Sequence, residues 1–219
     1  MIRHDVKQGT PEWLALRRGI PTASEFDSII SPTWKVRTGE GPRTYMVNKV
    51  CEKLLGFTSE DVQTFAMGQG VILEQEARPY YAFTYDVAVE AVGFCTTDDG
   101  RFGCSPDGLI GKDGGLEIKC PSPEKHLGYL LAGVVPSDYL AQVHGSLYVT
   151  GRQWWDFLSY SRQFPALVVR VQRDEAIMAA IGSALENFHA SFTQALAKVT
   201  AMRDAENAVK AANYQGGRD

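Results

Sequence analysis

The chain has 219 residues, of which 44% are hydrophobic and 22% are charged. This composition is ordinary for a domain that buries a core, and it excludes an intrinsically disordered chain. The formal net charge of −4 argues against a uniformly basic surface that coats nucleic acid. The sequence has no apolar run near the roughly 20 residues of a membrane span. We also expect no signal peptide, and four cysteines without a CxxC pair suit a reducing cytoplasm.

Apolar periodicity predicts helices toward both ends of the chain and strands in the middle. A helix opened by Pro11 comes first, and the pattern Thr22-Ala23-Ser24-Glu25 predicts a capping box before a second. Further helices are expected over 43–55, 64–83 (with Pro79 ending or kinking it), 124–132, 137–149 and 174–213. Strands are expected over 86–97, 102–104, 107–110, 115–120, 153–160 and 167–172. This order predicts one α/β (α+β) domain over 1–219, with 199–219 as a helical tail that frays at its end.

One pattern of charged residues points to chemistry. Ser105-Pro106-Asp107-Gly108 precedes Glu117-Ile118-Lys119, in the arrangement D-x9-E-x-K. Side chains alternate along a strand, so Glu117 and Lys119 share one face while Ile118 points into the core. A hairpin-like turn through the intervening glycines would bring Asp107 beside them. Two carboxylates next to an ammonium suit Mg²⁺ or Mn²⁺ rather than zinc, because these ions prefer hard oxygen ligands.

Such a site suits phosphodiester hydrolysis. Divalent ions lower the pKa of a bound water and neutralise charge on the scissile phosphate. Lys119 would hold the attacking water and stabilise the developing negative charge. The bare pattern also has a structural interpretation, in which Asp107 caps a turn and Glu117 and Lys119 form a cross-strand pair on the surface. The pattern alone leaves both interpretations open.

The surroundings of this pattern are more specific. SPDG followed by GLEIKCP closely resembles the core of the phage λ exonuclease-type alkaline exonucleases, the YqaJ-like viral recombinase family of the PD-(D/E)xK nuclease superfamily. Three other segments match motifs of that family in the same order. They are EWLALRRGIPTASEF near the N-terminus, G-x3-E-x-[DE]-A-R over 70–78, and YLAQV over 139–143. The resemblance spans residues 12 to 158 and continues more loosely beyond them.

The resemblance implies a restriction-endonuclease-like core, with a central mixed β-sheet flanked by helices. It also implies a Mg²⁺-dependent 5′-to-3′ exonuclease that digests one strand of double-stranded DNA. The products would be mononucleotides and a 3′ single-stranded overhang for phage-type recombination by single-strand annealing. Alternatives are another PD-(D/E)xK nuclease, such as a repair or restriction-type endonuclease, or an inert module that binds DNA ends.

By resemblance, Asp107 and Glu117 bind the metal with the help of the Ile118 backbone carbonyl, and Lys119 positions or activates the water. Glu74 matches a further acidic residue of the family, although a solvated helix carboxylate would look the same. We expect two Mg²⁺ ions per site, with Mn²⁺ able to substitute. The four cysteines do not cluster as the ligands of an iron–sulfur cluster do, so none is expected.

Four residues match family contacts to the terminal 5′-phosphate and the DNA, namely Arg17, Ser24, Ser105 and Gln142. A guanidinium offers paired donors to phosphate, and the first turn of a helix at Ser24 favours an anion. Arg17 alone would also fit a solvent-facing helix position. Gln142 lies on an otherwise apolar helix, which predicts a partner, although a buried glutamine satisfied by the backbone would look the same.

Trp34 is a further candidate for DNA contact, because it lies in a Pro-, Gly- and Arg-rich loop over 31–42. An aromatic side chain among basic residues can stack at a duplex end. Trp13 has two open interpretations, as a core residue or as part of the DNA path. His126 and His144 show no metal-ligand spacing and are expected to be structural.

The resemblance also implies partners. They are duplex DNA with 5′-phosphorylated ends, two further copies of the chain in a homotrimeric ring around the duplex, and a single-strand annealing protein. No membrane partner is expected. The protein would work in the cytoplasm of a bacterial host, encoded by a phage or prophage.

Overall fold

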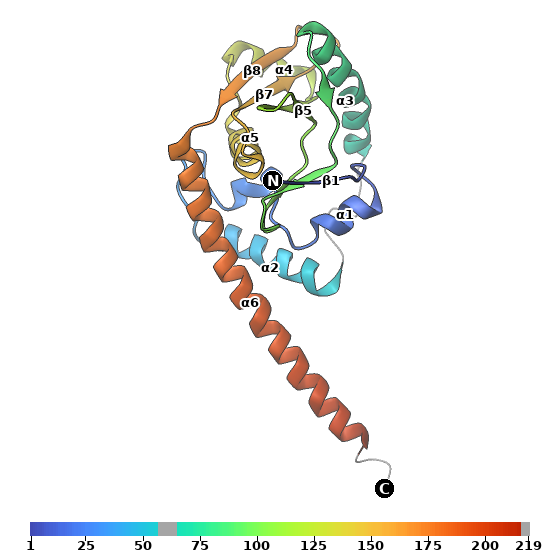
Figure 1. Cartoon of the computed structure of the whole chain (residues 1–219), viewed down its shortest axis with the longest axis vertical. Coiled ribbons are helices and arrows are strands. Elements are labelled where there is room, and N and C mark those ends of the chain that lie inside the picture. Colours follow the sequence, from blue (N-terminus) through green and yellow to red (C-terminus); the bar gives the residue numbers. More distant parts are fainter. Residues whose placement is uncertain (57–64, 216–219) are drawn as a thin grey trace.

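The computed structural model describes residues 1–56 and 65–215, including the side chains of residues 1–56 and 73–210. The strands are β1 (Ile2–His4), β2 (Val89–Glu90), β3 (Phe94–Thr96), β4 (Gly103–Cys104), β5 (Gly108–Ile110), β6 (Gly114–Lys119), β7 (Trp154–Ser159) and β8 (Leu167–Gln172). The helices are α1 (Pro11–Arg17), the 3₁₀ helix η1 (Ala23–Ser28), α2 (Glu40–Leu55), α3 (Phe65–Thr84), α4 (Pro123–Ala132), α5 (Ser137–Thr150) and α6 (Glu175–Gln215). Figure 1 shows their arrangement.

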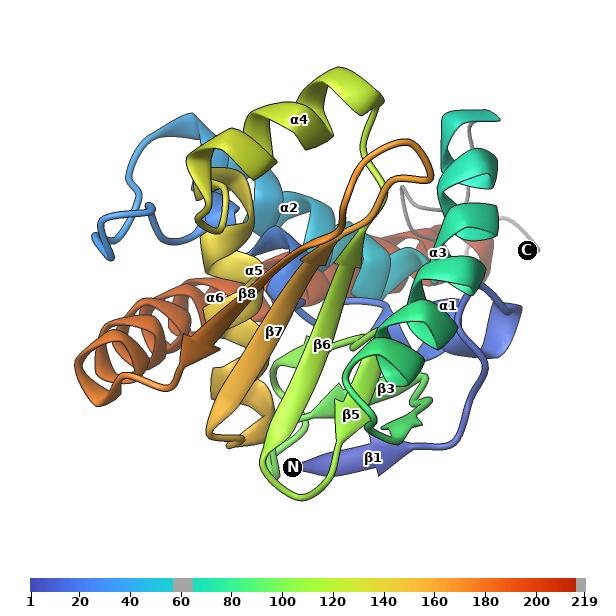
Figure 2. The same ribbon diagram turned by 90° about the horizontal axis from the view of Figure 1, so that it is seen from above.

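Within the described residues, five strands form a central sheet in the order β2-β5-β6-β7-β8, which Figure 2 shows from above. Strands β6 and β7 are parallel, and the other neighbouring pairs are antiparallel. A parallel pair needs a long crossover, and here it runs through α4 and α5. A small antiparallel sheet has the order β1-β3-β4. The predicted fold class, a single mixed α/β domain with a central mixed sheet flanked by helices, is confirmed.

The central sheet is covered on both faces. Helix α3 packs on one face, and a buried cluster joins it to β5, β6 and β7: Ala77, Tyr81, Ile110, Leu116, Ile118 and Leu158. Helix α5 packs on the other face, where Val143 and Leu147 lie in one cluster with Trp155 and Phe157. Because strand side chains alternate, Ile118 joins the α3 layer while Glu117 points toward α5. This alternation confirms the predicted orientation of the E-x-K strand.

The predicted strand over 86–97 is wrong as one element. It divides into β2 and β3, which belong to different sheets. Between them, a Cβ added to Gly93 would stand 1.7 Å from the carbonyl oxygen of Val6. The chain therefore crosses from one sheet to the other at a position where only glycine leaves room for the neighbouring backbone.

Helix α3 does not end at Pro79 but runs through it to Thr84. Proline removes one intrahelical hydrogen bond, and here burial of Ala77 and Tyr81 against the sheet holds the helix on both sides of it. The helix at the C-terminus reaches Gln215, and residues 216–219 of the predicted tail lie outside the described part. The second half of α6 extends away from the body of the molecule (Figure 1), and residues 201–210 are all exposed.

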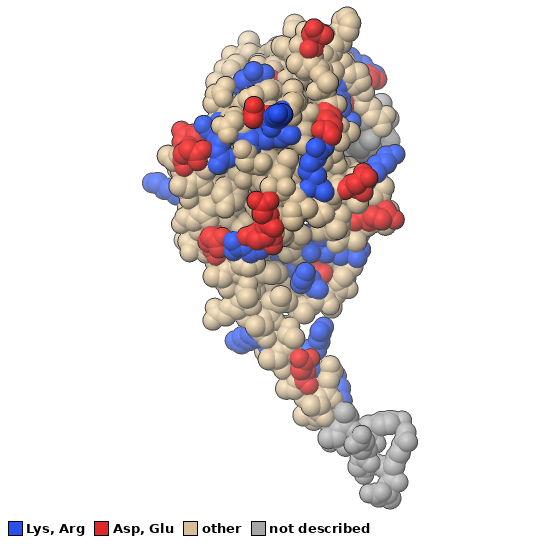
Figure 3. Space-filling model, in the orientation of Figure 1, with Lys and Arg blue, Asp and Glu red and all other residues tan. Residues whose placement is uncertain are grey.

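Among the described residues, no helix is both long enough and apolar enough to cross a membrane. On the face shown in Figure 3, acidic and basic side chains are interspersed over the body of the molecule. That face has no uniformly basic coat, as the net charge predicts.

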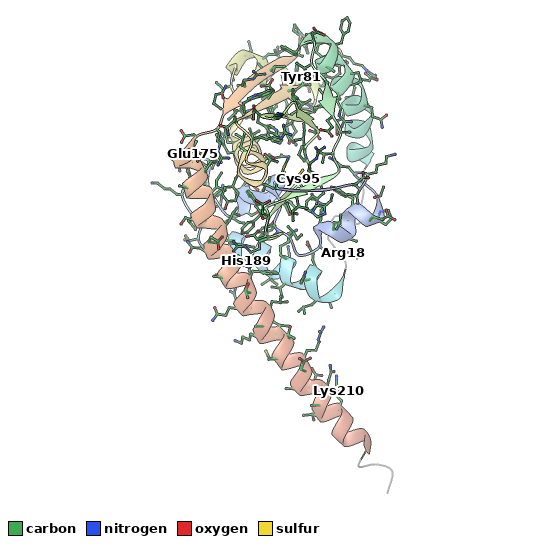
Figure 4. All side chains as sticks on the ribbon, in the orientation of Figure 1. Arg18, Tyr81, Cys95, Glu175, His189 and Lys210 are labelled. Atoms are coloured by element: carbon green, nitrogen blue, oxygen red, sulfur yellow. The ribbon has the colours of Figure 1, made fainter. Side chains whose placement is uncertain are left out.

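A buried carboxylate connects α3 to the sheet. Asp156 of β7 accepts a hydrogen bond from the hydroxyl of Tyr81 at 2.5 Å and two from Arg170 of β8, both at 2.8 Å. Figure 4 labels Tyr81 in the upper part of the molecule. Burial and the Asp156 carboxylate raise the pKa of the Tyr81 hydroxyl above its ordinary value. The hydroxyl therefore stays a donor.

We predict that Tyr81→Phe lowers the free energy of unfolding by about 1 kcal/mol, because Asp156 loses one donor in a buried site. Tyr80→Phe is the matched control, since Tyr80 is one residue away and exposed. Urea denaturation followed by circular dichroism measures both. Equal stability of the two variants would contradict a stabilising role for the Tyr81–Asp156 hydrogen bond.

Candidate active site

The β5–β6 hairpin brings Asp107 to Glu117, as the sequence predicts. Gly108 pairs with Leu116, so Asp107 lies just before β5 and beside the second half of β6. Its backbone N–H donates to the carbonyl of Leu116 at 3.1 Å, and its Oδ2 accepts the N–H of Ile118 at 2.5 Å. Asp107 is thus bound to the strand that carries the E-x-K sequence.

Two glycines at the start of β6 leave room for the tryptophan side chains of the neighbouring strand β7. A Cβ on Gly114 would stand 2.1 Å from the ring of Trp154, and one on Gly115 would stand 2.3 Å from the ring of Trp155. The two indoles of β7 therefore lie directly across the glycines of β6. The pair of glycines, read from the sequence as turn residues, is required by packing against the neighbouring strand.

The two carboxylate oxygens of Glu117 have different surroundings. Oε1 lies 2.7 Å from the Nζ of Lys119 and accepts a hydrogen bond from the side-chain amide of Gln142 at 2.6 Å. Oε2 is buried and has no hydrogen-bond partner in the described structure. A buried charged oxygen without a partner is costly. One oxygen of Glu117 is therefore held in place by α5 and Lys119, while the other is left for a further ligand.

Burial shapes the electrostatics of this group. Burial raises the pKa of Asp107 well above its usual range, and the nearby carboxylates Glu117 and Glu74 raise it further. Burial also raises the pKa of Glu117, although Lys119 opposes the effect. Burial alone would lower the pKa of Lys119, but the Glu117 and Asp107 carboxylates outweigh it and raise that pKa above its ordinary value. Lys119 is thus a cation beside two carboxylates that repel one another.

These residues fit a divalent cation. Asp107 and the unpartnered Oε2 of Glu117 are hard oxygen donors, and the backbone of Ile118 lies beside them. On a strand the N–H and C=O of one residue point to the same side, so the Ile118 carbonyl points the same way as its N–H, toward Asp107 and past the end of β5. Mg²⁺ characteristically takes one or two carboxylates and keeps several waters. The donor set matches that requirement.

Glu74 of α3 lies at the edge of this arrangement. It forms an ion pair with Arg78 at 3.3 Å, one turn along the same helix, and is partly exposed. Its charge acts on the pKa values of both Asp107 and Glu117. Among the described residues, however, no three or more His, Cys, Asp or Glu side chains are close enough to hold one metal ion. The assignment of Glu74 to the catalytic group stays a prediction.

Arg17 and Ser105 meet two residues upstream of Asp107. Nη1 of Arg17 donates to the hydroxyl of Ser105 at 3.2 Å, and the indole N–H of Trp13 lies 3.0 Å from the same oxygen. The Arg17 guanidinium stacks 4.2 Å above the Trp13 ring. Arg17 is buried rather than facing solvent, so its alternative interpretation as an ordinary surface arginine is wrong. Trp13 is a structural support of this polar group.

Ser24 lies in η1, and its surroundings differ from the predicted capping box. Thr22 makes no side-chain cap, and its hydroxyl instead lies 3.1 Å from that of Ser24. The Glu25 carboxylate faces α2, where it lies 3.1 Å from the Nζ of Lys49. The Glu25 carboxylate is therefore paired with this ammonium and not with the backbone N–H of Thr22, as a capping box would require. The element is a six-residue 3₁₀ helix, so the predicted helix-terminus effect at Ser24 is weak.

The remaining predicted residues have structural contacts in the described chain. The Trp34 ring packs edge-on against His144 of α5, with centroids 4.7 Å apart, and is partly buried against the core. His126 is fully buried between the Ser159 hydroxyl and the Pro165 carbonyl. DNA contact by Trp34 stays a prediction, and the structural interpretation of the two histidines agrees with their contacts.

The chain is similar to known proteins in both sequence and fold. The family model of the YqaJ-like viral recombinase domain matches residues 12–153. A crystal structure of an alkaline exonuclease, LHK-Exo, from Laribacter hongkongensis has 31% sequence identity and a TM-score of 0.80. The similarity covers 90% of this chain and 99% of that one. LHK-Exo in complex with dAMP gives 32% identity and a TM-score of 0.79.

A phage-related exonuclease from Haemophilus somnus 129PT shares the fold, with 14% identity, a TM-score of 0.59 and coverage of 82% of this chain and 96% of that one. Comparison with curated protein sequences gives no significant match. The family model spans more than half of the chain and includes every residue of the hairpin site, and LHK-Exo matches over nearly its whole length. The chain belongs to the YqaJ-like viral recombinase domain family.

Proposed function

We propose that the protein is a Mg²⁺-dependent exonuclease that digests one strand of double-stranded DNA in the 5′-to-3′ direction. The observation that carries this proposal is that Oε2 of Glu117, near Asp107, is buried without a partner among the described residues, while Lys119 contacts Oε1 of the same carboxylate. Similarity to an alkaline exonuclease over nearly the whole chain supports the same activity class.

The chain's own residues would divide the work of hydrolysis. Asp107, Oε2 of Glu117 and the Ile118 carbonyl would hold the ions, which supply charge neutralisation at the scissile phosphate and a more acidic water. Lys119 would orient the attacking water and stabilise negative charge in the transition state. Gln142 and Lys119, both at Oε1, fix the Glu117 carboxylate so that Oε2 faces the ions.

The Arg17–Ser105 pair would hold the terminal 5′-phosphate. Ser105 lies two residues from Asp107, so a phosphate bound there is close to the hydrolytic carboxylates. Fixing the terminal phosphate at one side of the metal site sets the bond that is cut, and the product is then a mononucleotide. The complex of LHK-Exo with dAMP agrees with a site that accommodates one nucleotide in that relative.

The biological setting belongs to the same proposal. A single chain of this size does not encircle a duplex, so a homotrimeric ring would supply processivity. The 3′ overhang would be the substrate of a single-strand annealing protein in phage-type recombination, in the cytoplasm of a bacterial host. The family description, a viral recombinase domain, supports the recombination role within this setting.

We predict rapid digestion of linear duplex DNA only in the presence of Mg²⁺, with a preference for 5′-phosphate over 5′-hydroxyl ends. Substrates labelled at either end of one strand, with Mg²⁺ or EDTA, measure both polarity and metal dependence. Comparable cleavage of closed circular DNA would contradict the exonuclease and favour an endonuclease. Binding without digestion would favour an inert end-binding module.

We predict that Asp107→Asn abolishes digestion and stabilises the metal-free protein by about 1 kcal/mol, which is ~2–4 °C in melting temperature for a domain of this size. The reason is that the substitution removes one of two buried like charges. Mg²⁺ should raise the melting temperature of the wild type but not of the variant. Asp113→Asn, in the exposed turn of the same hairpin, is the control. A destabilised, still active Asp107→Asn would contradict the assignment.

We predict that Arg17→Ala slows digestion of 5′-phosphorylated ends by roughly ten- to a hundredfold, because a charge-assisted contact to phosphate is lost. Digestion of 5′-hydroxyl ends should change little. Lys112→Ala removes one exposed positive charge at the far end of the hairpin and serves as the control. An equal loss on both kinds of end would argue against a phosphate pocket at Arg17.

A further inference from the structure

We propose that Lys49 and Glu52 of α2 are positioning residues that fix the two segments forming the 5′-phosphate pocket. This inference rests on the phosphate pocket proposed at Arg17 and on the phosphate contact that the family resemblance implies for Ser24, and it concerns residues outside both the phosphate contacts and the metal ligands. The two side chains form a buried ion pair, with Nζ of Lys49 at 3.1 Å and 3.2 Å from the two oxygens of Glu52. Their side chains are 6% and 7% exposed.

The Glu52 end of the pair holds the segment that follows Arg17. Oε2 of Glu52 accepts the backbone N–H of Gly19 at 3.0 Å, in a buried setting. Figure 4 labels Arg18 where the end of α1 approaches α2. The bond therefore ties the turn just after Arg17 to the last turn of α2.

Gly19 is shaped for this contact. Its φ of +69° is a conformation that favours glycine, and an added Cβ would stand 2.9 Å from the Cβ of Lys53 on α2. The turn after Arg17 thus lies directly on α2, with its N–H aimed at Glu52. This turn is one of the two segments that form the proposed pocket.

The Lys49 end of the pair holds the second segment, which is η1. Its ammonium lies 3.1 Å from Oε2 of Glu25, the residue after Ser24. The hydroxyl of Tyr45, also on α2, donates to the same oxygen at 3.3 Å. The interaction that takes Glu25 out of a capping box therefore fixes η1, and with it Ser24, to the same turn of α2 that holds Gly19.

A role in stability alone does not explain these charges. A buried ion pair loses much hydration, and well-packed apolar residues of similar volume are often equally or more stabilising. Charged groups also define a geometry, because an ammonium that lies between two carboxylates fixes the distance between those two carboxylates. Here one carboxylate belongs to Glu25, the residue after Ser24, and the other belongs to Glu52, which holds the turn after Arg17.

The test is the ratio of digestion rates on 5′-phosphorylated and 5′-hydroxyl linear duplex, measured for Lys49→Met/Glu52→Leu. We expect the ratio to fall roughly tenfold or more, because small displacements of positioning groups have effects of that size. The loss should be on phosphorylated ends, with the rate on hydroxyl ends and the melting temperature close to wild type. The control is Glu206→Gln/Lys210→Met, which removes an exposed pair at 2.6 Å on the distant part of α6 (Figure 4).

A second variant keeps the test decisive if the double substitution unfolds. Glu25→Gln removes only the partly exposed end of the network and leaves the Lys49–Glu52 pair intact. We expect it to lower the same ratio by a smaller factor. An unchanged ratio in a folded Lys49→Met/Glu52→Leu, or in Glu25→Gln when the double variant unfolds, would overturn the inference, as would an equal loss on both kinds of end.

Arg17→Ala, assayed in parallel, separates this inference from the proposed function. If Arg17→Ala lowers the ratio and the α2 variants do not, the phosphate pocket stands and the positioning role is wrong. If Arg17→Ala leaves the ratio unchanged, the pocket itself is wrong, and the positioning role falls with it.

Discussion

Two carboxylates are held together in a buried place by the short β5–β6 hairpin, and the rest of the candidate site depends on this constraint. Asp107 accepts the N–H of Ile118, so it cannot move away from the strand that carries Glu117. Without a cation, two buried like charges destabilise the fold. The chain tolerates this cost because the sheet, with Trp154 and Trp155 packed across the β6 glycines, fixes the hairpin on its other side.

The layers around the hairpin each supply one part of the site. Helix α5 places Gln142 on one oxygen of Glu117, and Lys119 contacts the same oxygen, while the other oxygen has no partner among the described residues. On the N-terminal side, Arg17 reaches Ser105 just before the hairpin. Helix α2 then fixes the segment after Arg17 through Glu52. The proposed catalytic and phosphate-binding parts are therefore joined through Ser105 and Asp107, two residues apart in the sequence.

Features set by short stretches of sequence, such as strand alternation and turns, could be predicted from the sequence. Strand alternation placed Glu117 and Lys119 on one face, and the glycines between Asp107 and Glu117 indicated the hairpin. Features that depend on contacts between residues far apart in the sequence could not be predicted in this way. The strand over 86–97 divides because Gly93 passes the backbone of Val6, and Glu25 turns to Lys49 instead of capping its own helix. The Lys49–Glu52 ion pair could have been predicted from the sequence, since these opposite charges lie three residues apart among the apolar positions of a predicted helix.

We propose above all that Asp107 and Oε2 of Glu117 bind a divalent cation. A crystal structure of the protein grown with Mn²⁺, with anomalous scattering measured at the manganese edge, tests it most directly. We predict a peak about 2.0–2.3 Å from Oε2 of Glu117 and from an Asp107 oxygen, with Oε1 still bonded to Gln142 and Lys119. A peak elsewhere, or none at saturating Mn²⁺, would contradict it.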